Sequence, residues 1–182
     1  MQANNMPHKK TLHKNQGFSL IELLIVVAII LIIAAIAIPS MLRSKQSANE
    51  ASAVSTMRLI STAEATYSAS YGTTNGFAAQ LALLGPGVPC DASHACLVDS
   101  NLGCAAEPCL RDGYNFFVMS DGNAPFADYA VTATPQFWGG TGSKNFCATE
   151  DSVLRYELGG AASKGSVIPH DTCIIFANYN AI

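Results

Sequence analysis

The sequence predicts an α+β fold in which one long N-terminal helix packs on a small antiparallel β-sheet stapled by disulfides. Three observations support this class. Residues 18–38 form an apolar run with a single acid, and residues 39–71 continue it with helical periodicity. β-rich segments separated by turn residues follow in 114–182, and six cysteines lie beyond the apolar run. A helix followed by a series of strands is typical of α+β proteins.

The run from Phe18 to Ile38 is long enough to cross a membrane as a helix. Its 21 residues span roughly 30 Å, which is the thickness of the hydrocarbon core of a bilayer. Glu22 lies inside this run. An acidic side chain within a membrane span costs about 2.5–3.5 kcal/mol on insertion scales, so Glu22 is a candidate functional residue that needs a partner.

The segment before the span has the character of a leader peptide. It contains three lysines and no acid, and it ends at Gly17, directly before Phe18. A secretory signal peptide would instead be cut after its apolar stretch. The segment Gly-Phe-Ser-Leu-Ile-Glu, followed by an apolar span and Pro39, resembles the class III leader and N-terminal region of type IV prepilins and pseudopilins.

This resemblance covers residues 16 to about 60 and implies a role for each matching position. In that family, a membrane aspartyl peptidase cuts after the glycine and methylates the new N-terminal amine. The resemblance therefore implies that residues 1–17 are removed, that the cut lies between Gly17 and Phe18, and that Phe18 is methylated. It gives Glu22 and Pro39 roles in assembly. The implied partners are further copies of the chain in a filament, the prepilin peptidase, and an inner-membrane assembly platform with its motor.

Removal of the leader would create a positive amine on Phe18, about 6 Å from Glu22 along the helix axis. Opposite charges attract strongly in a layer of low dielectric constant. The pair can form within one subunit, or between staggered subunits, where it would set the axial register of a fibre. The resemblance favours the second arrangement. The alternative is a signal anchor in which Glu22 is incidental and reaches interfacial water.

Charge predicts the orientation of the chain in the membrane. The leader carries three of the 10 basic side chains, so the mature 165 residues keep seven basic and 13 acidic side chains, a net charge of −6. Lysines ahead of the span predict a single-pass membrane protein with a cytoplasmic N-terminus. The resemblance implies that this membrane is the inner membrane. After assembly, the resemblance implies an extracellular pilus or a periplasmic pseudopilus. An acidic external domain argues against a nucleic-acid surface.

Beyond the span, residues 39–71 are predicted to continue the helix as an amphipathic segment. Pro39 is expected to kink or loosen it, and Gly72 provides a stop. Apolar residues that recur every three or four positions form one face, which we expect to cover the sheet. These residues are Ala48, Ala51, Val54, Met57, Ile60, Ala63 and Tyr67.

Residues 72–113 are predicted to be a Cys-rich connection between helix and sheet. Asn75 is a candidate cap for a short helix over Phe77–Leu84, which Gly85, Pro86 and Gly87 would end.

Cysteine spacing in this chain favours disulfides. The connection holds Cys90, Cys96, Cys104 and Cys109, without the paired C-x2-C spacing of structural zinc sites. An external location also favours oxidation. With Cys147 and Cys173 the six cysteines allow fifteen pairings. We favour a bond between Cys147 and Cys173 and two bonds among the other four, with a metal site that uses His94 as the alternative.

The last part of the chain, 114–182, is predicted to form an antiparallel meander and a C-terminal loop. Residues 158–172 are expected to be loop. A turn is expected at 121–123, and a cation site formed there with Asp128 is the alternative, which the missing EF-hand spacing disfavours. The expected strands are Tyr114–Met119, Asp128–Thr134, Asn145–Thr149 and Ser152–Glu157, with an edge segment at Cys173–Ala177.

Catalytic motifs are absent from the sequence. It contains no nucleophile elbow, no Gly-rich phosphate loop after a strand and no HExxH, so we predict no enzyme, cofactor or metal site. The prediction is a structural subunit of a type IV pilus-like filament, with adhesion, motility or DNA uptake as its roles. A pseudopilin of a type II secretion system is one alternative. A membrane-anchored binding module that does not polymerise is another, and it has no need of Glu22.

Overall fold

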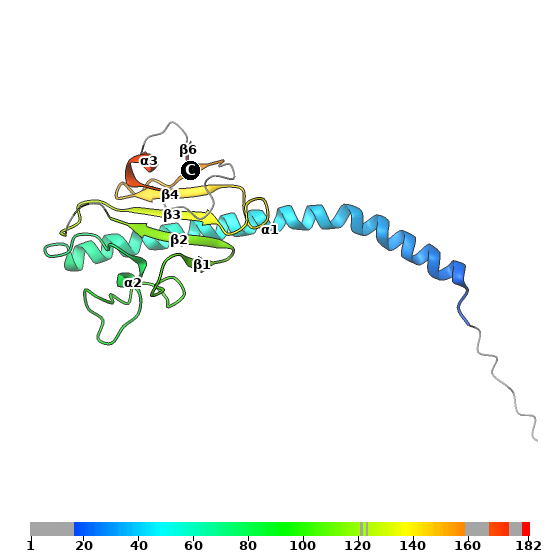
Figure 1. The fold of residues 1–182 in the computed structure, drawn as a ribbon, viewed down its shortest axis with the longest axis horizontal. Coiled ribbons are helices and arrows are strands. Elements are labelled where there is room, and N and C mark those ends of the chain that lie inside the picture. Colours follow the sequence, from blue (N-terminus) through cyan, green and yellow to red (C-terminus); the bar gives the residue numbers. More distant parts are fainter. Residues whose placement is uncertain (1–16, 121, 123, 159–167, 175–179) are drawn as a thin grey trace, which may run out of the picture. The chain divides into compact units, whose positions relative to one another are not determined.

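The computed structural model of the protein describes residues 17–120, 122, 124–158, 168–174 and 180–182. Contacts divide the chain into two units, one that ends at Ser40 and one that begins at Met41. The first unit contains the N-terminal part of helix α1. The second contains the rest of α1, two short helices and the β-sheet (Figure 1).

Helix α1 spans Leu20–Tyr71, 52 residues, and continues through Pro39. It ends where predicted, because the Gly72 N–H donates to the Ser68 carbonyl at 2.8 Å. A Cβ atom at position 72 would lie 2.1 Å from that same oxygen, so only glycine fits this stop. A kink at Pro39 stays a prediction.

The sheet of the second unit is an antiparallel meander. Each strand pairs with the next one along the chain, so the described residues form one sheet in the order β1-β2-β3-β4-β5-β6. This confirms the predicted α+β class. The strands are β1 (Cys109–Arg111), β2 (Tyr114–Met119), β3 (Ala130–Pro135), β4 (Asn145–Thr149), β5 (Arg155–Glu157) and β6 (Asn180–Ala181).

From Met57 to Tyr67, α1 covers one face of this sheet (Figure 1). Alternate residues of the central strands, among them Val131 and Phe146, contribute to the same apolar core. The predicted helix face is confirmed at four of its seven positions, since Met57, Ile60, Ala63 and Tyr67 are buried. The prediction was wrong about the length of this face.

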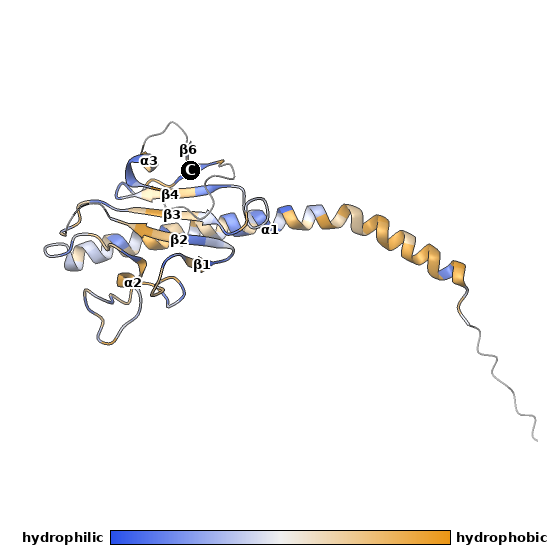
Figure 2. Ribbon diagram, in the orientation of Figure 1, coloured by the Kyte–Doolittle hydropathy of each residue, from blue (hydrophilic) through white to orange (hydrophobic). Residues whose placement is uncertain are grey.

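The buried face of α1 starts later than predicted, at Ala53. Ala48 and Ala51 are exposed and Val54 is half-buried, because at residues 46–52 the helix meets a polar loop and not the sheet. Figure 2 shows the corresponding change along α1, from hydrophobic residues interrupted by one hydrophilic position in the first turn to mixed residues beside the sheet.

The predicted helix over Phe77–Leu84 was too long. Helix α2 spans only Leu81–Leu84, with Gly85 at its C-terminal end. Asn75 does not cap it: the Phe77 N–H donates to the Phe126 carbonyl at 3.1 Å, and the Phe126 N–H donates to the Asn75 carbonyl at 2.9 Å. This pairing with a distant segment takes the backbone groups that a longer helix would use.

Two strand predictions near the C-terminus were also wrong. The strand expected at Ser152–Glu157 starts only at Arg155, because Ser152 has a left-handed φ of 58° and the Val153 N–H donates to Asp151 Oδ1. Cys173 was expected in an edge strand but lies in helix α3, His170–Ile174, where its N–H donates to the Pro169 carbonyl at 3.0 Å. Residues 175–177 of that expected strand lie outside the described residues.

Smaller differences concern strand ends. The strand expected at Asp128–Thr134 runs from Ala130 to Pro135, and β1 occupies three residues that were expected to be loop. The turn expected at Asp121–Asn123 and the cation site based on it depend on Asp121 and Asn123, which lie outside the described residues.

Candidate functional site

The first turn of α1 brings the predicted processing and assembly residues together. Gly17 and Phe18 precede the helix, and Phe18 is 87% exposed. The Ser19 carbonyl accepts hydrogen bonds from the N–H groups of Glu22, at 3.1 Å, and Leu23, at 3.3 Å. In return, the Ser19 N–H donates to Glu22 Oε2 at 2.9 Å.

This hydrogen bond is the glutamate half of a capping box, in which a Glu at the third helical position binds the backbone N–H of the residue before the helix. The sequence analysis missed it, although Ser-Leu-Ile-Glu is the pattern that predicts it. Glu22 therefore has a structural role in its own chain besides the charge pairing expected of it. Its carboxylate binds the N–H of Ser19, the residue directly after Phe18. A cut after Gly17 would create the new amine on Phe18, one residue away from this N–H.

The unit that contains this turn exposes a continuous apolar surface. The helix α1 is long and apolar enough to cross a membrane by length and composition, and none of the most apolar window is buried in the chain. Large apolar side chains from Leu20 to Leu42 are 45–81% exposed. A contiguous apolar surface of this length is typical of a membrane span or of a protein interface.

In the second unit, a polar clamp attaches α1 to the loop between β3 and β4. We define the clamp as Asn49 and Glu50 of α1 with Thr141, Ser143 and Lys144 of the loop. Asn49 Nδ2 donates to the Thr141 carbonyl at 2.9 Å. The N–H and hydroxyl of Ser143 donate to Glu50 Oε1 at 2.9 and 2.8 Å, and Lys144 Nζ lies 3.1 Å from Glu50 Oε2.

Three disulfides staple the second unit, which is the number predicted. They join Cys147 to Cys173, the bond we favoured, and then Cys90 to Cys96 and Cys104 to Cys109. No cysteine of the described residues is free. The metal alternative that used His94 fails for this reason, because its thiolate ligands are oxidised.

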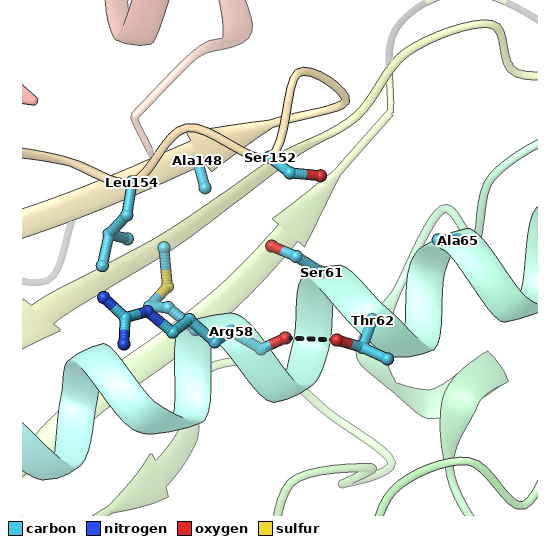
Figure 3. A pocket seen from close by; sticks show the side chains of 8 residues that line it. Arg58, Ser61, Thr62, Ala65, Ala148, Ser152 and Leu154 are labelled. Atoms are coloured by element: carbon cyan, nitrogen blue, oxygen red, sulfur yellow. Dashed lines mark hydrogen bonds between the residues drawn. The ribbon is translucent and has the colours of Figure 1, made fainter. Parts of the chain in front are cut away.

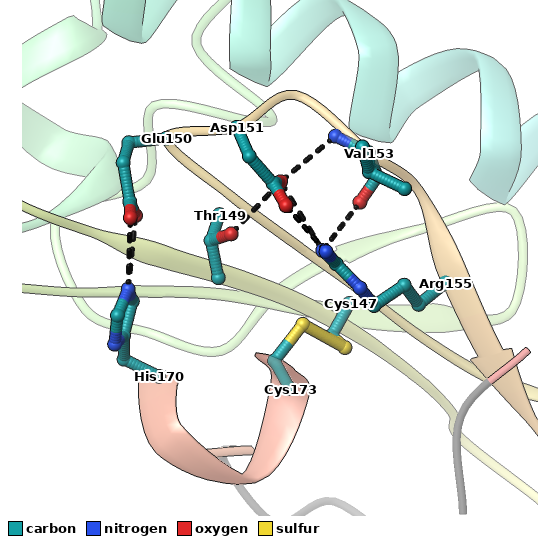
Figure 4. The surroundings of a disulfide bond; sticks show 8 residues. All are labelled: Cys147, Thr149, Glu150, Asp151, Val153, Arg155, His170 and Cys173. Carbon is teal, nitrogen blue, oxygen red and sulfur yellow. Dashed lines mark hydrogen bonds and ion pairs between the residues drawn. A yellow bond between two sulfur atoms is a disulfide. The ribbon is translucent and has the colours of Figure 1, made fainter. Parts of the chain in front are cut away.

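The Cys147–Cys173 bond attaches α3 to β4, as Figure 4 shows. Two ion pairs lie beside it. His170 Nε2 of α3 lies 2.9 Å from Glu150 Oε2, and the Arg155 guanidinium binds the Asp151 carboxylate. Burial lowers the pKa of His170, but hydrogen bonding and the charge of Glu150 outweigh burial and raise the pKa overall.

A groove of about 400 Å³ lies between α1 and the turn after β4 (Figure 3). Its apolar lining residues are Met57, Ala65, Ala148 and Leu154, and Arg58 and three hydroxyl groups complete the lining. This lining contains no acid, histidine or cysteine, so it offers neither a general base nor a metal ligand of those types. No group of side chains suited to a metal ion occurs among the described residues.

Comparison with known proteins locates the similarity at the N-terminus. Residues 12–38 match the prokaryotic N-terminal methylation motif. The matched range contains Gly17, Phe18, Glu22 and the whole apolar run. No curated protein and no solved structure matched the chain.

Proposed function

Because the chain is a type IV pilin-like prepilin with a class III leader, we propose that it is a structural subunit of a type IV pilus-like filament, polymerised through its apolar N-terminal helix. In this proposal, prepilin peptidase removes residues 1–17 and methylates Phe18. An inner-membrane platform and its motor then extract the mature chain from the bilayer into the filament, where Glu22 and Pro39 act in assembly.

The observation that carries the proposal is Glu22 on the otherwise apolar, exposed run of α1 between Leu20 and Ile38. In a monomer the carboxylate binds the Ser19 N–H and stabilises the first turn of α1, but it still carries the insertion penalty of an acid within a membrane span. In a fibre, the same carboxylate neutralises the Phe18 amine of a neighbour and opposes axial displacement of the subunits. The capping box holds the carboxylate at the N-terminal end of α1, where such an amine arises.

The test separates the charge of Glu22 from its capping role. Glu22→Gln keeps an oxygen that can accept the Ser19 N–H but removes the charge, whereas Glu22→Leu removes both. We expect both variants to be processed and to stay in the membrane, but to give few filaments in sheared fractions viewed by electron microscopy. Glu50→Gln, a change of the same type in the clamp, is the matched control and should assemble.

Wild-type filament yield from Glu22→Gln would contradict the charge pairing. A chain that is processed but never found in sheared filaments, with or without Glu22, would instead support a membrane-anchored binding module. A pseudopilin of a type II secretion system shares the whole N-terminal argument. Filaments confined to the periplasm would favour that function, and filaments on the cell surface favour the pilus.

A further inference from the structure

The third acid of α1, Glu64, has no role in the assembly argument. It is 0% exposed, although it faces the Cys-rich connection from the middle of an otherwise apolar helix face. Its Oε2 accepts a hydrogen bond from the Ala78 N–H at 2.8 Å. Its Oε1 has no hydrogen-bond partner, and Glu64 belongs to none of the ion pairs among the described residues.

A second carboxylate binds the same segment from the other side. Glu107, within the Cys104–Cys109 loop, accepts the Leu81 N–H on Oε1 at 2.6 Å and the Val118 N–H on Oε2 at 3.1 Å. Leu81 is the first residue of α2, and the preceding Gln80 makes no side-chain cap. Glu107 therefore caps α2, while Glu64 binds the chain three residues earlier.

These contacts are part of a small set that docks residues 77–109 on the rest of the unit. Tyr67, one turn beyond Glu64 on α1, donates from its hydroxyl to the Ala92 carbonyl at 2.7 Å. The Ser120 hydroxyl, after β2, donates to the Ala78 carbonyl at 3.1 Å. Glu64 is thus one of two α1 side chains with hydrogen bonds to residues 77–109 among the described residues.

Burial and the titratable neighbours of Glu64 disfavour its ionisation, and only the Ala78 N–H favours it. Burial raises its pKa to about 8, the charge of Glu107 adds to this, and the Ala78 hydrogen bond opposes it. Burial likewise raises the pKa of Glu107. Tyr67 and Tyr129 are the other titratable neighbours, and burial raises the pKa of both, that of Tyr129 to about 12.

The charged groups farther from Glu64 do not favour its ionisation either. Asp91 acts on Tyr67, and Glu150 and Asp151 act on Tyr129, so these outer charges are acidic as well. An ionised Glu64 would leave a charged oxygen buried without a hydrogen bond, near a second carboxylate. That is much less favourable than a neutral carboxyl group in the same place.

We propose that the proton on Glu64 is a latch: while Glu64 is protonated, the segment from Ala78 to Leu81 stays docked on α1, and loss of the proton favours local opening of residues 77–109 while the sheet remains folded. The latch does not depend on polymerisation, because every contact in it lies within one chain.

The direction of the pH dependence follows from proton binding. In the open form Glu64 meets water and has its usual pKa of 4.5, whereas the closed form holds the proton up to about pH 8. Between these values the closed form binds more protons, so each pH unit raises the opening equilibrium by up to roughly tenfold. Above about pH 8 both forms are ionised and the dependence levels off.

The experiment is amide hydrogen exchange of the Ala78 and Leu81 N–H groups in the full mature chain in detergent, from pH 5 to pH 9. Glu64→Gln is the reference because it stays neutral at every pH. The ratio of wild-type to variant exchange rates removes the intrinsic pH dependence of exchange. We expect this ratio to rise with pH by at least tenfold between pH 5 and pH 8, then to flatten.

Three further measurements make the result specific. Glu50→Gln, another neutralised acid of α1, should keep the wild-type rise. At the Val131 N–H, in the centre of the sheet, the ratio of wild-type to Glu64→Gln exchange rates should stay constant with pH. Glu107→Gln removes the neighbouring charge and should move the plateau to lower pH.

A wild-type to Glu64→Gln ratio that stays constant from pH 5 to pH 9 would overturn the latch. Parallel rises at Val131 and Ala78 would also overturn it, since the change would then be global unfolding. Should Glu64→Gln fail to fold, the comparison of Ala78 with Val131 in the wild type, repeated in Glu107→Gln, decides the question without it.

Discussion

Glu50 of α1 and Lys144, directly before β4, form an ion pair in which Oε2 and Nζ lie 3.1 Å apart. The pair closes the clamp at the place where α1 meets the loop between β3 and β4. The clamp also contains two hydrogen bonds from Ser143 to the other carboxylate oxygen of Glu50. Because Lys144 is partly exposed, we expect the ion pair itself to contribute less than the Ser143 bonds.

Glu50→Ala should lower the free energy of unfolding by about 1–3 kcal/mol, because it leaves the Ser143 donors without their acceptor. Glu50→Gln keeps an acceptor and loses only the ion pair, so it should cost below about 1 kcal/mol. Denaturation of the mature chain in detergent, followed by the fluorescence of Trp138, measures both. Equal losses for the two variants would show that the ion pair dominates the clamp.

The clamp should also weaken in acid. Burial raises the pKa of Glu50, but the hydrogen bonds from Ser143 and the charge of Lys144 outweigh burial and hold the pKa below its usual value. The contribution of Glu50 is therefore fully present above the usual glutamate pKa and is lost as pH falls through the lowered one. Denaturation of the wild type and of Glu50→Gln between pH 7 and pH 3 should show that the difference between their free energies of unfolding shrinks as pH falls. Parallel curves would contradict this assignment.

Asp151→Asn should destabilise the turn between β4 and β5. Arg155 is only 3% exposed, and the Asp151 carboxylate binds its guanidinium, the Thr149 hydroxyl and the Val153 N–H. Asparagine takes a negative charge away from the buried guanidinium and keeps only one acceptor oxygen, and we expect a loss of about 2–4 kcal/mol. Asp112→Asn, at an exposed acid of another turn, is the control and should change stability by less than about 1 kcal/mol. A loss as small as that of Asp112→Asn would contradict the prediction.

The disulfides should differ in what they contribute. The chain-entropy relation gives about 3–4 kcal/mol for Cys147–Cys173, which closes 26 residues, and about 2 kcal/mol for Cys90–Cys96, which closes six. Replacing each pair by two serines and measuring denaturation tests this order. A larger loss from the Cys90 and Cys96 pair would show that native packing, rather than loop closure, sets the contribution.

Oxidation can be checked independently of mutation. We expect protein taken from its native envelope to show no free thiol under denaturing, non-reducing conditions. Mild reduction should loosen residues 85–113 first, because that stretch holds two of the three bonds and few large apolar side chains. Four or more free thiols would contradict the disulfide framework.

Gly17→Val should block processing without changing the fold. Nothing lies within 4 Å of the Cβ position at residue 17, so the larger side chain meets no obstacle in the chain itself. The resemblance places Gly17 at the peptidase cut, where a branched side chain should prevent cleavage. We expect a membrane protein of full length, visible by intact mass. Release of the mature chain from this variant would place the cut elsewhere.

Sequence reasoning predicted the parts of this fold that repeat a simple pattern. α1, the end of the helix at Gly72, the central strands β2 and β4 and the number of disulfides all follow from periodicity, β propensity or cysteine count. The predictions failed where partners distant in sequence take backbone groups. Phe126 pairs with Asn75 and Phe77 and prevents a longer helix, and the Pro169 carbonyl draws Cys173 into α3.

Polar side chains on buried positions were also missed. Glu64 occupies an apolar helix face, and its proximity to Glu107 follows only from the path of the connection through the Cys104–Cys109 bond. The Ser19–Glu22 cap, in contrast, was readable as Ser-x-x-Glu.

The mass of the subunit from purified sheared filaments tests the central claim most directly. The account predicts a chain of residues 18–182 with one added methyl group on Phe18 and six cysteine hydrogens missing, recovered as the main filament component. A filament subunit that begins at Met1, or that begins after Ala37 as a secretory cut would leave it, would contradict the account.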